Sequence, residues 1–249
     1  MKPIPELVSV VTPVYNASAT LQKTIDSIRA QTYRDWELIL VDDASSDDSV
    51  RIAQAALALD KRIHLIRLND NRGAAVARNL ALDAARGQYI AFLDADDCWD
   101  STKLAKQLDF MKQRNVAFTY TAYRTTKGRI IRVPESVDYE RLITDNVIGC
   151  LTVVIDRHQI GDFQMPNVRK GQDHLTWLSL LKPGRLAYGL NDVLATYTVG
   201  NNDSLSGNKL KAVKRQWFNY RKVLGFGWFT SVKYLIKYAV AALRKHNGN

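Results

Sequence analysis

Short apolar runs alternate with longer amphipathic segments through the first hundred residues. Four runs have the length and the largely β-branched or aliphatic composition of buried strands: Val8–Val14, Trp36–Val41, Ile63–Leu68 and Tyr89–Leu93. A parallel strand is covered on both faces, so it reads as a nearly continuous apolar run, as these four do. The segments between them carry apolar residues at helical spacing. Four such strand–helix units predict an α/β domain with a doubly wound, mostly parallel sheet flanked by helices.

Helix boundaries in this half can be predicted from residues that favour helix ends. Ser18 precedes the first amphipathic segment, so we expect its hydroxyl to cap that helix. A later helix is expected from Ala74 to Ala85. We expect it to stop at Gly87, because glycine commonly follows the last turn of a helix.

The alternation changes after Trp99. Further elements are predicted at 101–114 (helix), 116–123, 129–133 and 147–155 (strands), 172–181 (helix) and 194–199 (strand). The sequence shows no internal repeat and no low-complexity linker. The second half is therefore expected to extend the sheet of the first. We expect one domain over 1–203, with a nucleotide-binding half at 1–100 and an acceptor half at 101–203, followed by a helical extension at 204–249.

The positive charge is concentrated in that extension. The chain has 249 residues, 46% of them hydrophobic, and a net charge of +10. No Asp or Glu follows Asp203, whereas ten basic residues do: Lys209, Lys211, Lys214, Arg215, Arg221, Lys222, Lys233, Lys237, Arg244 and Lys245. The rest of the chain is neutral, with 25 basic and 25 acidic residues. Such a tail is expected to seek a polyanionic surface.

The end of the extension combines this charge with a broad apolar face. Its apolar residues are Phe226, Trp228, Phe229, Val232, Leu235, Ile236, Val240 and Leu243. Lys233, Lys237 and Arg244 fall along one helical stripe. This pattern is typical of a helix that lies in a membrane interface. The alternative is a helix packed on the protein's own body with solvated charges. The basic residues form no recognised nucleic-acid module, so no nucleic-acid partner is expected.

The strand at Tyr89–Leu93 ends in an acidic turn, Asp94-Ala95-Asp96-Asp97. Carboxylates this close repel one another unless a cation lies between them, and oxygen ligands suit Mg²⁺ or Mn²⁺. In an open α/β sheet, ligands bind outside the carboxyl ends of the strands, where these residues fall. The alternative is a solvated turn that caps the next helix.

Polar residues at three strand ends, taken together, resemble glycosyltransferase family 2, the inverting enzymes of the GT-A fold. The resemblance runs from Val8 to about Tyr197. It is carried by the segments Thr12–Asn16, Ser27–Tyr33, Val41–Asp47, Asn71–Asn79 and Phe92–Asp97. The order and spacing of these motifs are more specific than any one of them. The expected fold is therefore a GT-A fold, with a Rossmann-like sheet and a basic C-terminal helical extension.

The resemblance implies a role for each matching position. Tyr15 would stack on the nucleotide base, and Asp43 would accept a hydrogen bond from it. Arg78 would lie near the diphosphate. Asp94 and Asp96 match the family's Asp-X-Asp motif, so Asp96 would bind Mn²⁺ or Mg²⁺, with Asp94 near the ribose or the metal. Asp97 is the alternative ligand, and Pro13 and Ala95 would complete the nucleotide-sugar site.

A catalytic base is expected in Gly171–Leu178, which matches the family's Glu-Asp-X-X-X-Trp pattern with Trp177 as the tryptophan. Asp173 falls on the position of the base, which takes the proton of the acceptor hydroxyl. Gln172 stands where Glu is commoner. This departure removes a charge but leaves the position of the base filled, so it bears on acceptor contacts more than on activity.

The sequence thus predicts a metal-dependent, inverting glycosyltransferase. It would move a sugar from a UDP-linked donor to a lipid-linked glycan in surface-polysaccharide synthesis. One alternative is a catalytically silent nucleotide-sugar-binding scaffold on the same fold. A nucleotidyltransferase is disfavoured, because Tyr15-Asn16-Ala17-Ser18 replaces a Gly-rich phosphate loop.

The expected location is the cytoplasm, at the inner face of the plasma membrane. Neither a secretion signal nor a transmembrane helix is predicted. Cys98 and Cys150 lack a metal-ligand spacing, which favours a reducing compartment.

Overall fold

The computed structural model describes residues 3–181, 184–200 and 209–247. Its first half alternates strands and helices as predicted. The strands are β1 (Ile4–Val14), β2 (Trp36–Asp42), β3 (Ile63–Arg67) and β4 (Gly87–Phe92), and the helices are α1 (Leu21–Arg29), α2 (Ser49–Leu59) and α3 (Ala74–Ala84). β3, β2, β1 and β4 lie side by side in that order, and each adjacent pair is parallel.

The second half adds both antiparallel and parallel strand pairs to the same sheet. Its strands are β5 (Cys98–Trp99), β6 (Phe118–Thr125), β7 (Ile130–Ile131), β8 (Ser136–Val137), β9 (Val154–Asp156) and β10 (Ala187–Tyr197). Its helices before the extension are α4 (Lys103–Arg114), α5 (Tyr139–Leu142), the 3₁₀ turn η1 (Cys150–Thr152), α6 (Arg157–Ile160) and α7 (Gln172–Leu180). The main order of the sheet is β3-β2-β1-β4-β9-β6-β10-β5. The prediction that the second half extends the first sheet is confirmed.

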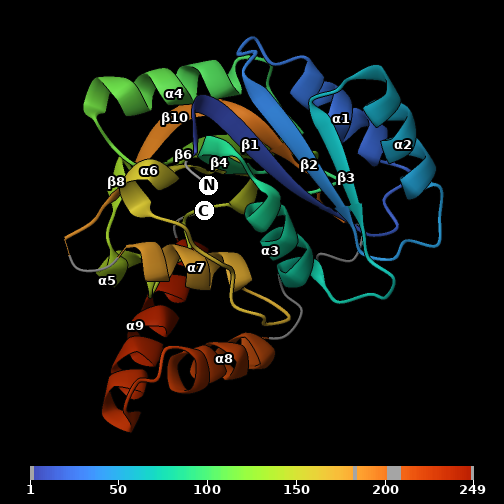
Figure 1. Cartoon of the computed structure of the whole chain (residues 1–249). Coiled ribbons are helices and arrows are strands. Elements are labelled where there is room, and N and C mark those ends of the chain that lie inside the picture. The colour runs from blue at the N-terminus through green and yellow to red at the C-terminus, as the bar shows by residue number, and fades with distance from the viewer. Residues whose placement is uncertain (1–2, 182–183, 201–208, 248–249) are drawn as a thin grey trace.

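Helices cover both faces of this sheet (Figure 1). Alternate residues of each central strand point to opposite faces, because the side-chain period of a strand is two. Val10 and Leu38 belong to a core shared with α1, α2 and α4, whereas Val11 and Ile39 belong to a core shared with α3 and Trp177 of α7. All five side chains are at most 1% exposed. This burial on two faces explains why the central strands are apolar throughout.

Two predicted helix ends were wrong. The residue before α1 is Thr20, and its side chain makes no capping hydrogen bond. Ser18 lies before it, and its backbone N–H donates to Asp47 Oδ2 at 2.9 Å. α3 ends at Ala84, and Gly87 instead begins β4. A Cβ on Gly87 would lie 2.4 Å from the carbonyl oxygen of Leu7, so glycine is needed there for close approach of β1.

Two predicted strands differ from the structure. The apolar segment 147–155 is mostly irregular: it contains η1, and β9 covers only Val154–Asp156. Thr152 Oγ1 donates to the carbonyl of Gly149 at 2.6 Å, a local bond that favours a turn. The last strand begins at Ala187 and not at Leu194. Its first half was not predicted because Gly189, Asn191 and Asp192 interrupt the apolar pattern of β10. The short elements β5, β8, α5 and α6 were not predicted.

The C-terminal extension is helical, as expected. It contains α8 (Lys209–Phe218), the π-helical turn η2 (Asn219–Val223) and α9 (Trp228–Asn247). One face of it packs on the body. Tyr220 Oη donates to the carbonyl of Ile143 at 2.8 Å and Tyr234 Oη to Glu140 Oε1 at 2.6 Å, and both tyrosines are buried. The expected boundary between residues 203 and 204 lies outside the described residues.

No helix in the described ranges is both long enough and apolar enough to cross a bilayer.

Candidate functional site

The carboxyl ends of β1, β2 and β4 meet at one edge of the sheet. In register, Val14 of β1 lies beside Asp42 of β2, and Val11 lies beside Phe92 of β4. The residues that follow these strands surround a pocket of about 330 Å³. Its lining residues are Pro13, Val14, Tyr15, Asn16, Ala17, Thr20, Asp43, Ala74, Arg78, Asp94, Ala95 and Asp96. All seven residues that were predicted to bind the nucleotide sugar or the metal line this one pocket.

Tyr15 presents an aromatic ring at the mouth of this pocket, because it is 54% exposed. The next residue, Asn16, has φ of 48°, a left-handed conformation that asparagine tolerates. Asn16 is fixed there by the loop after β2: its N–H donates to Ser45 Oγ at 3.0 Å, and its Oδ1 accepts from the N–H of Ser46 at 2.8 Å. An exposed ring on a fixed turn is suited to stacking on a flat ligand.

Asp43 organises the floor of the pocket. Its carboxylate accepts from the backbone N–H of Arg72 at 2.7 Å and of Gly73 at 2.9 Å, one bond to each oxygen. Asn71 Nδ2 donates to its carbonyl at 3.2 Å. A carboxylate has about four lone-pair positions, so two bonds leave it able to accept from a ligand. Asp43 thus holds the loop before α3 and faces the pocket at the same time.

Arg78 and Asp94 form an ion pair inside the pocket. Arg78 is 6% exposed and its Nη2 contacts Asp94 Oδ1. Burial works against the charge of Arg78, but Asp94, together with Cys150 and Asp173, outweighs it, and the pKa of the guanidinium is raised. The buried Nε of Arg78 has no hydrogen-bond partner. A buried, permanently charged donor with an unsatisfied N–H is suited to an anionic ligand, because leaving such a group unpaired is costly.

Two threonines at the start of α1 hold the acidic turn in place. Thr20 Oγ1 donates to the carbonyl of Ala95 at 2.9 Å, and Thr24 Oγ1 lies 2.8 Å from the carbonyl of Asp97. Asp97 is 1% exposed and does not line the pocket; its Oδ1 accepts from the N–H of Thr198 at 2.7 Å. Burial, with Asp94 and Asp96 nearby, raises the pKa of Asp97 to about 8. Its position favours a structural role over that of an alternative metal ligand.

The pocket offers oxygen ligands that suit a divalent cation. Asp96 is exposed and Asp94 is half-buried, and both line the same cavity. In the part of the chain that the structure describes, no group of three or more His, Cys, Asp or Glu residues could hold a metal alone. That arrangement fits Mg²⁺ or Mn²⁺, which proteins commonly hold through one or two carboxylates together with the phosphates of a substrate.

Asp173 lies in the first turn of α7. The helix follows Gly171, whose φ of 78° favours glycine. Trp177 anchors α7 to the sheet, because its ring packs edge-on against Phe92 at 5.5 Å and Phe118 at 5.4 Å between centroids. The motif tryptophan is thus a core residue that orients the helix. Asp173 does not line the pocket of about 330 Å³, but its carboxylate helps to raise the pKa of Arg78.

Cys150 is coupled electrostatically to both of these parts of the site, which the sequence did not predict. Burial raises the pKa of its thiol well above the ordinary value, Arg78 opposes that rise, and Asp94 and Asp173 add to it. Cys150 therefore lies within electrostatic reach of both the pocket and α7. The sequence offered no signal for this, because a lone cysteine in an apolar segment is normally a core residue.

Asn79 is the last residue of the family segment Asn71–Asn79, and the sequence predicted no role for it. Its Nδ2 donates to the carbonyl of Met165 at 2.8 Å, and its Oδ1 accepts from the N–H of Met165 at 2.7 Å. This two-point contact joins α3 to the loop that leads into α7. It ties the helix that carries Arg78 to residue 165 in that loop, and such a long-range pair cannot be predicted from one sequence.

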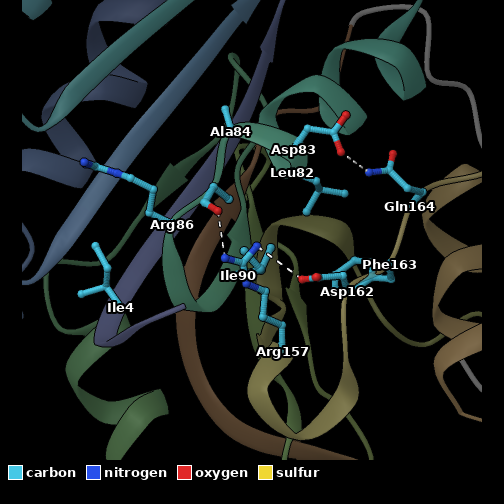
Figure 2. A pocket seen from close by; sticks show the side chains of 11 residues that line it. Ile4, Leu82, Asp83, Ala84, Arg86, Ile90, Arg157, Asp162, Phe163 and Gln164 are labelled. Atoms are coloured by element: carbon cyan, nitrogen blue, oxygen red, sulfur yellow. Dashed lines mark hydrogen bonds and ion pairs between the residues drawn. The ribbon is translucent and has the colours of Figure 1, made fainter. Parts of the chain in front are cut away.

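A second cavity, of about 420 Å³, lies at the other end of the strands (Figure 2). Ile4 and Arg86, which line it, lie at the amino ends of β1 and β4. Arg157 Nη2 donates to the carbonyl of Ala85 at 2.8 Å, and Asp83 Oδ1 accepts from Gln164 at 2.7 Å. None of the predicted site residues lines it, so the pocket at the carboxyl ends is the candidate site.

The sequence was compared with family models and with curated proteins. The model of glycosyl transferase family 2 matches residues 9–165. TuaG of Bacillus subtilis (strain 168), provisionally named a teichuronic acid biosynthesis glycosyltransferase, is 47% identical over 245 residues, covering 96% of this chain and 97% of TuaG. WfgD of Escherichia coli, a UDP-Glc:alpha-D-GlcNAc-diphosphoundecaprenol beta-1,3-glucosyltransferase, is 38% identical over 249 residues, covering 96% of this chain and 95% of WfgD.

Solved structures share the fold at lower identity. Staphylococcus aureus TarS 1-349 in complex with UDP has a TM-score of 0.70 at 19% identity, covering 96% of this chain and 71% of the 1-349 fragment. The mannosyltransferase PcManGT from Pyrobaculum calidifontis, in complex with GDP-Man and Mn²⁺, has a TM-score of 0.70 at 18% identity, covering 97% and 75%. The expected GT-A fold is confirmed by these likenesses.

Proposed function

This chain belongs to glycosyl transferase family 2, and from that premise we propose that it transfers a sugar from a UDP-linked donor to a lipid-linked glycan, with inversion at the anomeric carbon. The observation that carries the proposal is the convergence of Tyr15, Asp43, Arg78, Asp94 and Asp96 on one pocket at the carboxyl ends of the strands. A pocket at this edge is the usual ligand site of an open α/β sheet.

Different pocket residues bind the base and the diphosphate of the nucleotide. Tyr15 stacks on the uracil ring. Asp43 accepts a hydrogen bond from the N–H of that ring, through lone pairs that are not used by the backbone N–H groups of Arg72 and Gly73. Arg78 stabilises the diphosphate, which is the leaving group. Pro13 and Ala95 line the walls. The relative WfgD supports the choice of a UDP-sugar, because its name specifies UDP-Glc as the donor.

Asp96, with Asp94, would hold a divalent cation next to the diphosphate. When bound, the cation offsets the negative charge that develops on the diphosphate as the glycosidic bond breaks. Asp94 also forms an ion pair with Arg78, so its carboxylate connects the metal site to the guanidinium group. Mn²⁺ in the PcManGT complex supports this choice of cofactor.

Asp173 acts as the general base. The acceptor hydroxyl oxygen attacks the anomeric carbon from the side opposite the diphosphate, and the carbon–oxygen bond to the diphosphate breaks, so UDP leaves with the electron pair. Asp173 takes the proton of the attacking hydroxyl. One in-line displacement inverts the anomeric configuration. The carboxylate lies in the first turn of α7 and acts electrostatically on Arg78, which supports its place near the reacting groups.

The C-terminal extension would hold the enzyme at a bilayer where a lipid-linked acceptor resides. Several of its large apolar side chains are exposed: Trp228 (57%), Phe229 (83%), Ile236 (60%) and Val240 (42%). Lys233 and Lys237 are exposed on the same helix. Exposed apolar side chains with interspersed cations favour contact with an anionic leaflet.

Transfer can be tested with radiolabelled UDP-sugars, Mn²⁺ and a synthetic acceptor that carries a sugar diphosphate on a short hydrocarbon chain. The proposal predicts a labelled, elongated product with the inverted anomeric configuration. If folded protein neither transfers sugar nor hydrolyses any nucleotide sugar, the chain is a silent nucleotide-sugar-binding scaffold and the proposal fails.

A further inference from the structure

The extension contains a concave apolar groove that is separate from the exposed aromatic residues of α9. The groove has a volume of about 510 Å³ and lies between α8 and α9, next to η2. Its apolar walls are Val213, Trp217 and Phe218 on α8 and Leu235 on α9. A volume of this size, with mostly apolar walls, is typical of a small-molecule site, for which the usual range is about 300–1,000 Å³.

The polar part of the groove is entirely basic. Lys214, Arg221 and Lys222 line it, and none of the described residues that line it is acidic. Residues four apart lie on one helical face, so Lys214 and Lys222 flank Phe218 along one row. Arg221 Nη1 donates to the carbonyl of Phe226 at 2.5 Å, which holds the side chain with one of its five N–H donors. A hydrocarbon chain with an anionic head complements such a lining.

The groove is joined to the catalytic helix through η2. Asn219, in the same π-helical turn as Arg221, is 5% exposed, and its Nδ2 lies 3.9 Å from where a Cβ on Gly171 would be. Gly171 directly precedes Gln172 and Asp173 in α7. π-helical turns occur frequently at functional sites. Figure 1 shows α8 and α9 beneath α7, on the side away from the sheet.

We propose that this groove binds the lipid diphosphate of the acceptor. The hydrocarbon chain nearest the diphosphate lies against Trp217, Phe218 and Leu235, and Lys214, Arg221 and Lys222 bind the diphosphate. The acceptor sugar is thereby directed toward Asp173. A bilayer surface is a different partner: it would contact convex, exposed side chains such as Trp228 and Phe229, which do not line the groove. The inference rests on the proposed function only for the lipid-linked nature of the acceptor.

The groove can be tested by calorimetry without donor or membrane, with farnesyl diphosphate as the probe. We expect it to bind at least about tenfold more tightly than inorganic diphosphate or farnesol alone, because it fills both the apolar and the basic parts. UDP should not compete. If UDP does displace the probe, the probe occupies the nucleotide pocket, and the assignment of the groove is wrong.

Two matched variants locate the binding. Phe218→Glu places a charge in the groove at a side chain that is 53% exposed, so folding should survive; we expect about a tenfold loss of farnesyl diphosphate affinity. Phe229→Glu makes the same change at an 83% exposed position outside the groove and should leave that affinity unchanged. Equal losses in both variants would overturn the proposal.

Two further arms identify the lipid and separate this proposal from the proposed function. Dihexanoyl phosphatidylglycerol should bind more weakly than farnesyl diphosphate; equal affinity would mean a general phospholipid site and would overturn the assignment to the acceptor. UDP affinity is measured on the same samples. If UDP binds and farnesyl diphosphate does not, the groove proposal fails alone, whereas loss of UDP binding would speak against the nucleotide site.

Discussion

At the residue scale, Arg78 links the parts of the site. It is buried on α3, pairs with Asp94 at the end of β4, and is within electrostatic reach of Cys150 and Asp173. Its positive charge stabilises the carboxylates around it before any ligand is present. Arginine stays charged under such burial, whereas a lysine could lose its proton, so the residue type matters here.

Asp173→Asn tests the general base. We expect kcat for sugar transfer to fall by about 100- to 10,000-fold, which is the usual contribution of general-base catalysis, with UDP affinity unchanged. Asp83→Asn, which alters a carboxylate at the second cavity, is the matched control and should keep full activity. Wild-type turnover by the Asp173→Asn variant would show that another group takes the proton.

Much of the nucleotide pocket could be predicted from the sequence, because several of its residues follow strands closely, whereas Arg78, on α3, was predicted only from the family resemblance. Tyr15, Asp43 and Asp94 come after β1, β2 and β4, and parallel strands bring such residues to one edge. The contact of Asn79 with Met165 and the inward turn of Asp97 depend on pairs 86 and 101 residues apart. No local pattern encodes those distances.

At the element scale, α4 begins with a buried lysine. Lys103 Nζ donates to Gln107 Oε1 at 2.8 Å and lies 4.3 Å from the centroid of the Trp99 ring. Gln107 Nε2 in turn donates to Thr119 Oγ1 and to the carbonyl of Thr152, each at 3.0 Å. The network joins α4, β6 and η1 behind the acceptor half of the sheet. Its amide and cation–π contacts offset part of the cost of burying an ammonium group.

The buried lysine predicts a stability that depends on pH. Burial lowers the pKa of Lys103 from 10.5 to about 7. Between these values the unfolded chain binds more protons than the folded one, so the free energy of unfolding rises with pH, by at most about 1.4 kcal/mol per unit. In urea titrations from pH 7 to 9, Lys103→Met should flatten this rise. An equal slope in both proteins would contradict it.

The strands of the first half could be predicted because burial on both faces makes their sequences continuously apolar. The helices between them could be predicted from apolar residues at helical spacing. The second half contains short strands, such as β5 and β8 with two residues each, whose pairing is decided by distant partners. The segment at 147–155 shows the limit most clearly. It is apolar because it is buried, but a threonine–glycine contact folds it into a turn.

At the scale of the whole molecule, the extension adopts one of the two arrangements that the sequence left open, packing on the body, and membrane contact stays a prediction. One face docks on the body through Tyr220 and Tyr234, and other apolar side chains remain exposed. Composition alone could not decide between these arrangements, because aromatic residues serve both. The extension therefore adds a second apolar region to a molecule whose nucleotide pocket is polar.

Membrane contact can be measured by co-sedimentation with vesicles. We expect binding to phosphatidylglycerol vesicles but weak binding to phosphatidylcholine, with loss at high salt, because each basic residue near an anionic surface contributes about 1 kcal/mol. Phe229→Glu should reduce binding, and Leu59→Glu, a change at a similarly exposed position on α2, should not. Equal binding to both lipids would contradict an electrostatic contribution.

We propose above all that Asp96 and Asp94 would hold a divalent cation next to the diphosphate of UDP, in the pocket at the strand ends. The most direct measurement is calorimetry of UDP binding with and without Mn²⁺, on the native chain and on Asp96→Asn. We predict tight binding that requires Mn²⁺ and is lost in the variant. Binding that neither the metal nor the substitution alters would contradict the claim.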